Sequence, residues 1–396
     1  MSELYFTRGL GLRGEVRDRL TSDYHSDLVD RLRASGFSMS VEDTTIRLAE
    51  EFGFCYGVER AVDYAYQTRQ RFPDRNVLIT GEIIHNPGVN GRLRSMGIHF
   101  LDGSDGLPVP KPGAGDVVII PAFGVPVPTM EEYRSAGCVL VDTTCGSVLN
   151  VWKNVENYAR NGLTSVIHGR YSHEETQATA SRALRYPLGR FLVVRDIEQA
   201  RLVCDYILGR GDRAQFLSTF ASAASPGFDP DRDLDRIGLA NQTTMLSSES
   251  LEIAGMIRAA MRERHGEALT ADRFRSFDTI CSATQDRQDA VNKLVASGLD
   301  MMIVIGGYNS SNTTHLAEIS STSVPTYHVA NAGCLVSRET IRHKPLHATV
   351  EVDCVGWLPA GPLVIGVTAG ASTPNSEVGV TIDRLLAFRG HPPIPA

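Results

Sequence analysis

The sequence predicts an α/β protein with three similar α/β domains, whose mostly parallel sheets are arranged in pseudo-threefold symmetry around a common centre. Two observations carry this prediction. From residue 46 onwards, short apolar runs alternate with helical patterns, which is typical of parallel α/β layers. In addition, a pattern of strand, cysteine and helix occurs three times along the chain.

Six apolar runs rich in β-branched residues are predicted strands, and each ends in small or polar residues. The runs are "NVLIT", "DVVII", "TSVIH", "IGLA", "DMMIVI" and "PLVIGV". The clusters that follow include "GEIIHN", "GRYSHEET", "NQTTMLSSES", "GGYNSSNTTHL" and "TAGASTPNSEV". Because ligands of open α/β sheets bind at the carboxyl ends of the strands, we expect binding residues in these clusters.

The threefold pattern places Cys55, Cys145 and Cys281 at equivalent strand-to-helix corners. Two of the three segments share the motif D-T-x-C. After each cysteine, apolar residues follow the spacing of a buried helical stripe. These residues are Val58, Ala61, Val62 and Ala65 in the first helix, Val148, Trp152 and Val155 in the second, and Val291, Leu294 and Val295 in the third. Three units related by approximate threefold symmetry would direct the three thiols at one point.

Such thiols are candidate metal ligands. A helix N-terminus stabilises a thiolate through its dipole and its unpaired N–H groups. Three thiolates leave one position of a metal site open, which in general marks catalysis rather than structure. The alternative is three unrelated cysteines at helix starts. The other four cysteines, scattered along the chain, are expected to be small buried residues and not a disulfide framework: Cys138, Cys204, Cys334 and Cys354.

The composition excludes several classes of protein. The 396 residues carry 39 basic and 46 acidic side chains, a net charge of −7 without a long basic run, which argues against nucleic-acid binding. No apolar run approaches the ~20 residues that cross a bilayer. The N-terminus has early acidic residues and no apolar segment, so we expect no targeting signal and a cytoplasmic location.

The chain divides into four predicted parts. Residues 1–45 are polar and charge-mixed, and we expect them to form a helical N-terminal extension outside the core. Residues 46–145 are the first α/β domain, with Cys55 and Cys145 at its edges, and residues 146–278 are the second. Residues 279–396 are the third domain and a C-terminal segment.

The polar clusters allow two interpretations each. His173 and Glu175 form an H-x-E pair, which suits metal binding or acid–base work, or simply a solvated loop. A zinc deaminase would also need a P-C-x-x-C motif, and the sequence has none. The hydroxyl and amide groups of "NQTTMLSSES" and "NSSNTTH" suit helix capping or an anion site at helix N-termini. The sequence has no glycine-rich nucleotide motif.

Eight ordered motifs together resemble one family. They are "GFCYGVERA", "GEIIHNPGVN", "VDTTC", "YSHEETQAT", "NQTTMLS", "DTICSATQDRQDAV", "GGYNSSNTTHL" and "GVTAGASTP". This set is similar to the 4-hydroxy-3-methylbut-2-enyl diphosphate reductases, also called the LytB family, over about residues 46–385. The N-terminal extension and "SVIHGRYSHEET" resemble the plastid and cyanobacterial branch.

The resemblance implies a fold, a cofactor and a reaction. It implies three α/β domains around a central [4Fe–4S] cluster, with Cys55, Cys145 and Cys281 as ligands and one open iron. The implied reaction reductively removes the hydroxyl of the allylic diphosphate, giving isopentenyl and dimethylallyl diphosphate in the last step of the non-mevalonate pathway. An electron donor such as reduced ferredoxin or flavodoxin is also implied.

The resemblance assigns further site residues. Glu175 matches the acidic position that delivers protons, with Thr243 and His173 in its network. Thr284 matches a position close to the substrate. The positions that match substrate-binding residues of the family are His85, His173, Thr243, Thr284, Ser310, Ser311, Asn312 and Ser372, of which His85 and the last four contact the diphosphate.

Two departures from the family pattern stand out. The motif "AHGV" reads "AFGV" here, so Phe123 replaces a diphosphate-binding histidine, and the resembled branch shares this change. "TTCP" reads "TTCG", so Gly146 loosens the turn after the second cysteine. Two other classes stay open as alternatives, a non-enzymatic iron–sulfur sensor that keeps the cysteines and a zinc hydrolase on the same thiols.

Overall fold

The structure is a computed structural model that describes residues 4–103, 106, 109–277 and 279–391. The chain forms two compact units. Unit 1 comprises residues 1–7 and 109–281, and unit 2 comprises residues 8–108 and 282–396. Both units are α/β with mostly parallel strands, which confirms the predicted fold class.

Unit 1 contains two groups of parallel strands. In the first, β1 (Tyr5–Phe6) pairs with β7 (Val139–Asp142), which pairs with β6 (Val117–Ile120). The second has the order β11-β10-β8-β9. Its strands are β8 (Thr164–His168), β9 (Arg190–Val194), β10 (Ile237–Asn241) and β11 (Phe274–Ser276).

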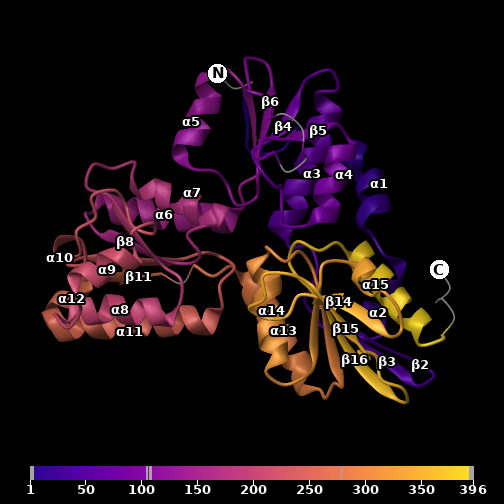
Figure 1. Cartoon of the computed structure of the whole chain (residues 1–396). Helices are drawn as coiled ribbons and strands as arrows, with labels where there is room; N and C mark the ends of the chain where they lie inside the picture. The colour runs from indigo at the N-terminus through magenta and orange to yellow at the C-terminus, as the bar shows by residue number, and fades with distance from the viewer. Residues whose placement is uncertain (1–3, 104–105, 107–108, 278, 392–396) are drawn as a thin grey trace. The chain divides into compact units, whose positions relative to one another are not determined.

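Helices cover both faces of this second sheet (Figure 1). Side chains alternate along a strand, so Leu192 and Val194 pack toward α8 and α11, while Phe191 and Val193 pack toward α6 and α7. The helices of unit 1 are α5 (Val127–Ser135), α6 (Gly146–Arg160), α7 (Glu174–Ala183), α8 (Ile197–Ile207), α9 (Arg213–Thr219), α10 (Pro230–Asp233), α11 (Ser247–His265) and α12 (Glu267–Arg273).

Unit 2 is built on a five-stranded sheet with the order β13-β12-β16-β3-β2, antiparallel only at β2. A parallel pair, β4-β5, and an antiparallel hairpin, β14-β15, complete its strands. The strands are β2 (Ser38–Val41), β3 (Thr44–Leu48), β4 (Val77–Ile79), β5 (Ile98–Phe100), β12 (Met301–Ile305), β13 (Thr326–Val329), β14 (Thr340–His343), β15 (Val352–Val355) and β16 (Leu363–Ala369).

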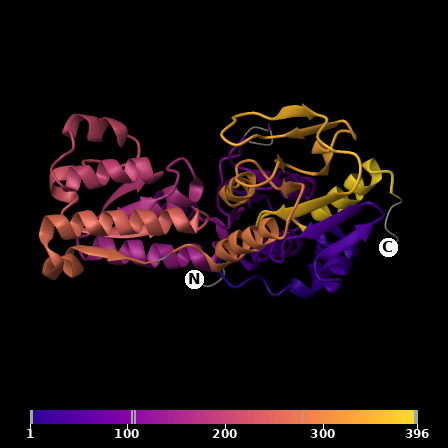
Figure 2. The same cartoon turned by 90° about the horizontal axis from the view of Figure 1, so that it is seen from below.

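The core of this sheet contains residues of both α2 and α15, from the N-terminal and C-terminal parts of the chain. Helix α15 packs against α2, so the C-terminal helix lies beside the N-terminal segment (Figure 2). The helices of unit 2 are α1 (Arg13–Tyr24), α2 (Asp27–Ala34), α3 (Tyr56–Arg71), α4 (Pro87–Ser95), α13 (Ser282–Ala296), α14 (Ser311–Ser321), η1 (Ala332–Cys334) and α15 (Asn375–Phe388).

The N-terminal segment contains helices α1 and α2, as expected, but also strands β1 and β2, and the expectation that it lies outside the core is wrong. Leu28, Val29 and Leu32 are buried in the main hydrophobic cluster of unit 2. They lie at helical spacing on one face of α2. The other residues of this helix are mostly charged, so the average composition of the segment does not reveal the apolar face.

The six predicted strands are all present, as β4, β6, β8, β10, β12 and β16. The proposed domain boundaries stay a prediction, and boundary residues 1, 278 and 396 lie outside the described residues. One strand pairing crosses these boundaries. Strand β3, which spans the predicted boundary between residues 45 and 46, pairs with β16 of the predicted third domain, in register from Thr44↔Leu363 to Leu48↔Val367. In the described part of the chain, no helix is both long and apolar enough to span a membrane.

Candidate active site

The three candidate ligand cysteines lie where the repeat predicts, each between a strand and a helix. Cys55 and Cys145 are the N-cap residues of α3 and α6, both with extended backbone conformations. Cys281 immediately precedes α13. All three are half-buried. A helix N-terminus favours the thiolate form that metals bind, so the corners suit the predicted role.

Two of the remaining cysteines contrast with these corners. Burial raises the pKa of the Cys138 thiol above its ordinary value and that of Cys204 to about 11. Both sulfurs therefore stay protonated near neutral pH. This environment suits a small buried side chain, as the sequence predicts for them, and not a metal ligand.

In unit 1, a buried carboxylate is held in place by one threonine. Glu175 is 3% exposed on the first turn of α7. The Thr243 backbone N–H donates to its Oε1 at 2.6 Å, and the Thr243 hydroxyl donates to its Oε2 at 2.9 Å. The carbonyl of the same threonine accepts the Cys281 N–H at 3.2 Å. Glu175, Thr243 and Cys281 therefore form one connected group.

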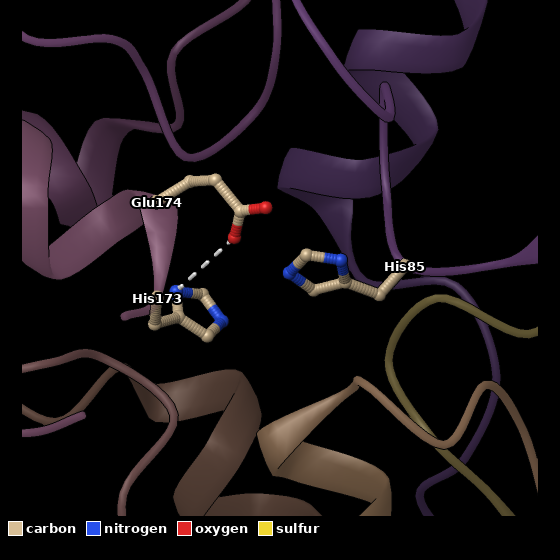
Figure 3. A group of neighbouring side chains, drawn as sticks. All are labelled: His85, His173 and Glu174. Carbon is tan, nitrogen blue, oxygen red and sulfur yellow. Dashed lines mark ion pairs between the residues drawn. The ribbon is translucent and has the colours of Figure 1, made fainter. Parts of the chain in front are cut away.

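His173 is the N-cap residue of α7 and is fixed by the helix itself. Its Nδ1 accepts the backbone N–H of Glu175 at 3.2 Å. An accepting nitrogen carries no proton, so the neutral ring holds its proton on Nε2. The nearby Glu174 Oε2 is 4.0 Å from Nδ1, too far for a hydrogen bond (Figure 3). The ring is thus a donor at Nε2.

Phe123 links this histidine to the second cysteine. Its ring meets the His173 ring edge to face, with the ring centroids 6.2 Å apart. The preceding Ala122 carbonyl accepts the Cys145 N–H at 2.7 Å. Gly124 has φ +77°, and a Cβ there would lie 2.4 Å from Trp152, so only glycine fits. The "AFGV" motif therefore contacts both the Cys145 backbone and the His173 ring.

Sequence reasoning missed a second carboxylate in this unit. Asp142 Oδ1 accepts the N–H of Thr144 at 2.9 Å and its hydroxyl at 2.5 Å, while Oδ2 accepts the Tyr5 hydroxyl at 2.5 Å. This network fixes Thr144, the residue before Cys145. The aspartate of the D-T-x-C motif was the available signal, and its counterpart, residue 278, lies outside the described residues.

In unit 2, the first turn of α14 presents hydroxyl and amide groups. Ser310 caps the helix, with its Oγ accepting the Thr313 N–H at 3.3 Å. Ser311 and Asn312 follow, and each is 2% exposed. Asn312 Oδ1 accepts the Ala371 N–H at 2.9 Å, but its Nδ2 has no partner among the described residues. A buried unpaired donor at a helix N-terminus suits an anion.

The loop after β16 brings three other candidates to this helix. Ser372 Oγ donates to the His85 carbonyl at 3.0 Å, and the Cys55 N–H donates to the Ala371 carbonyl at 3.2 Å. A Cβ on Gly307 would lie 2.5 Å from the His85 carbonyl oxygen, so a glycine there permits the close packing.

The imidazole of His85 is oriented by Glu82, whose Oε2 lies 2.8 Å from Nδ1. Asn309 Nδ2 also donates to Glu82, at 2.6 Å. Figure 3 labels His85, which belongs to unit 2, together with the unit 1 residues His173 and Glu174. Glu82 and Asn309 escaped sequence reasoning, although Glu82 is only three residues from His85.

The predicted residues therefore gather into two groups. Unit 1 assembles Cys145, His173, Glu175, Thr243 and Cys281. Unit 2 assembles Cys55, His85, Ser310, Ser311, Asn312 and Ser372, with Thr284 buried in the first turn of α13.

Comparison with known proteins identifies the family. The family model of the LytB protein matches residues 46–386. The 4-hydroxy-3-methylbut-2-enyl diphosphate reductase of Gloeobacter violaceus is 51% identical, covering 98% of this chain and 94% of the relative. The same-named protein of Thermosynechococcus vestitus is 49% identical, covering 98% of this chain and 96% of the relative. These cyanobacterial relatives confirm the predicted branch.

Two solved structures share the fold. The first is described as (E)-4-hydroxy-3-methyl-but-2-enyl diphosphate reductase, the terminal enzyme of the non-mevalonate pathway, with 29% identity and a TM-score of 0.52 over 86% of this chain and 99% of the other. The second is the Plasmodium falciparum reductase, with 21% identity and a TM-score of 0.61 over 87% and 90% of the two chains, a likeness of fold. On the family match and these relatives, the chain belongs to the LytB protein family.

Proposed function

We propose that this chain reduces 4-hydroxy-3-methylbut-2-enyl diphosphate to isopentenyl and dimethylallyl diphosphate, the last step of the non-mevalonate isoprenoid pathway. One substrate, two electrons and two protons become one product and one water. Relatives about half identical to this chain over nearly their full length carry the name of this reductase. The observation in the structure that supports the reaction best is the buried Glu175, which Thr243 connects to Cys281.

The cofactor of the LytB family is an iron–sulfur cluster, and the donor set of this chain fits one. Three half-buried thiols begin helices, while the environment of Cys138 and Cys204 keeps those sulfurs protonated. We assign Cys55, Cys145 and Cys281 as the three ligands of a [4Fe–4S] cluster with one open iron. When bound, the cluster supplies electrons and a Lewis-acidic position for the leaving oxygen.

Residues of unit 1 supply the protons of the reaction. We assign Glu175 as the proton donor, because its buried carboxyl group is oriented by Thr243, whose carbonyl accepts the Cys281 N–H. Thr243 orients both carboxylate oxygens. His173 donates through Nε2, since its Nδ1 is committed to the Glu175 N–H. A neutral donor can bind an oxygen atom of the substrate without adding a fixed charge.

Residues of unit 2 bind the diphosphate. The N-terminus of α14 offers its dipole, its first N–H groups and the hydroxyls of Ser310 and Ser311. The unpaired Nδ2 of Asn312 adds a donor that burial makes costly to leave without a ligand. Ser372 and His85 complete this group, which needs no metal ion to bind an anion. Thr284 is assigned a contact with the organic part of the substrate.

The sensor alternative keeps the cysteines but predicts no role for a proton donor. Glu175 argues against it, because a sensor needs no buried carboxylate that is oriented by Thr243 and connected to Cys281. A zinc hydrolase on the same thiols would be colourless, whereas an iron–sulfur protein is brown. An electron donor such as reduced ferredoxin or flavodoxin and a cytoplasmic location remain proposals alongside the reaction.

An anaerobic turnover assay tests the reaction. Protein reconstituted with iron and sulfide is mixed with the allylic diphosphate and methyl viologen reduced by dithionite. The two isomeric diphosphates should appear together, with two viologen radicals oxidised per substrate consumed. A brown protein that binds the substrate but oxidises no viologen above the enzyme-free rate would favour the sensor.

A further inference from the structure

A groove on unit 2 lies beside the first cysteine corner. It has a volume of about 790 Å³ and runs between α1 and α3, which pack side by side (Figure 1). A smaller hollow of about 250 Å³ adjoins it and shares Arg13, Glu59 and Asp63 in its lining. We call the two together the α1–α3 groove.

The charge of the α1–α3 groove is opposite to that of the chain. Five arginines line it against the two carboxylates of Glu59 and Asp63, in a chain of net charge −7. The arginines are Arg8, Arg13, Arg17, Arg33 and Arg60. Helix α1 turns Arg13 and Arg17 into the groove, while its own acidic residues are absent from the lining. The basic character is therefore local to this surface.

An aromatic residue connects the α1–α3 groove to the cysteine. Tyr56 is 80% exposed, lines the groove and is the first residue of α3, directly after Cys55. Phe54, on the other side of Cys55, also lines it. Exposed tyrosine together with arginine is the composition of protein interfaces rather than of ordinary surface. The groove thus ends at the residues that flank a proposed cluster ligand.

We propose that the α1–α3 groove is the docking surface for a small acidic electron-carrier protein, which delivers its electrons next to Cys55. This inference rests on the proposed function, which consumes two electrons per substrate. Each docking event oxidises the carrier by one electron and reduces the enzyme by one, so two events complete one turnover.

Electrostatics explains why such a surface is needed here. Two acidic proteins repel each other at long range, so association depends on a local patch of opposite sign that steers the encounter. A small anion is a poorer occupant, because Arg13 is 77% exposed and already lies 3.5 Å from Glu59. Exposed arginines attract a charged surface but do not enclose a small ligand.

The test compares two reductants on the same iron-loaded full-length chain. One is methyl viologen reduced by dithionite, and the other is an acidic [2Fe–2S] ferredoxin kept reduced by NADPH and a ferredoxin reductase. The groove variant is Arg8→Glu with Arg17→Glu. The matched control is Arg201→Glu with Arg262→Glu, two arginines of unit 1 with side chains 60% and 63% exposed. Both variants change the net charge equally.

We expect the groove variant to lose about tenfold or more in kcat/KM for the ferredoxin at low salt, while its viologen-driven rate stays at the wild-type value. The control variant should change much less. Raising the ionic strength should reduce the wild-type ferredoxin rate toward that of the groove variant, because the Debye length falls.

Several outcomes would overturn the proposal. Equal ferredoxin rates in the groove and control variants would place docking elsewhere. A loss of the viologen rate in the groove variant that recurs in Arg8→Gln with Arg17→Gln would show that the arginines support folding instead. Inhibition by inorganic phosphate beyond chloride of equal ionic strength, seen only with intact arginines, would assign the groove to a small anion. A wild-type chain inactive with viologen would overturn the reaction itself.

Discussion

The two units treat their most important buried polar groups in opposite ways. In unit 1, both oxygens of Glu175 accept hydrogen bonds from Thr243, so the carboxylate is fixed and paired. In unit 2, Asn312 uses its Oδ1 on Ala371 and leaves Nδ2 without a partner among the described residues. A paired group is positioned for chemistry, whereas an unpaired donor is prepared for a ligand. The contrast predicts that unit 1 governs kcat and unit 2 governs KM.

The largest effect should come from removing a proposed cluster ligand, because both substrate binding and reduction depend on the cluster. Cys281→Ser replaces a soft thiolate with a hydroxyl, which is a poor ligand for iron–sulfur clusters. We expect the iron and sulfide content to fall sharply and the activity to drop below detection. Iron analysis and visible absorbance after anaerobic reconstitution provide the measurement.

Cys204→Ala is the matched control for this change. Its sulfur is buried in the core of unit 1, so it should cost only packing and keep the cluster. Full iron content in Cys281→Ser would remove Cys281 from the ligand set, whatever its effect on activity.

The next effect separates chemistry from binding. Glu175→Gln keeps the shape and can still accept the Thr243 N–H, but it carries no acidic proton. We expect kcat to fall by about 10²- to 10⁴-fold with little change in KM. Viologen oxidation over a range of substrate concentrations measures both constants.

Glu174→Gln serves as the control, because the neighbouring residue on the same turn of α7 has a side chain that is 56% exposed. Its kcat should stay close to the wild-type value. If the two glutamine variants lose the same amount of kcat, the buried carboxylate has no special role as proton donor.

The third effect should appear in KM. Asn312→Asp keeps the Oδ1 that accepts the Ala371 N–H and removes only the unpaired donor. Hydrogen bonds to charged groups contribute roughly 1.5–3 kcal/mol, so KM should rise about 10- to 150-fold while kcat changes less. The added negative charge should push the result toward the upper end.

Asn154→Asp, on the exposed surface of α6, controls for the change in net charge. A KM within about twofold of wild type in Asn312→Asp would mean that the diphosphate does not contact this amide.

The sequence predicted the local features of this site and missed the long-range ones. The six strands and the three cysteine corners follow from periodicity and from the strand–cysteine–helix repeat, both of which act within about twenty residues. Strand pairing has no such local signal. The parallel pairing of β3 with β16 and of β1 with β7 joins residues more than a hundred positions apart.

The same limit applies to side chains. Glu175 and Thr243 were linked by resemblance alone, since 68 positions separate them, and the structure supplies their two hydrogen bonds. The contact between Tyr5 and Asp142 was not predicted because the N-terminal segment looked peripheral. The Tyr5 hydroxyl nevertheless completes the hydrogen-bond network before Cys145. The polar composition of a segment does not reveal a residue such as Tyr5, whose role depends on a partner far along the chain.

The smallest effect concerns Phe123, which stands where the resembled family motif "AHGV" has a histidine. The sequence predicts an apolar wall beside the ligand, and the structure shows its ring packed edge to face on His173. Such a pair contributes about 0.5–1.5 kcal/mol, so Phe123→Leu should lower kcat by about 2- to 12-fold through a less well-held His173. It removes no polar group, so KM should hardly change.

His85→Ala should instead raise KM about tenfold or more, because it deletes a contact to a charged diphosphate. Phe277→Leu, an exposed ring of unit 1, controls for the loss of an aromatic group. If Phe123→Leu raises KM more than His85→Ala does, the division of labour between the two units is wrong.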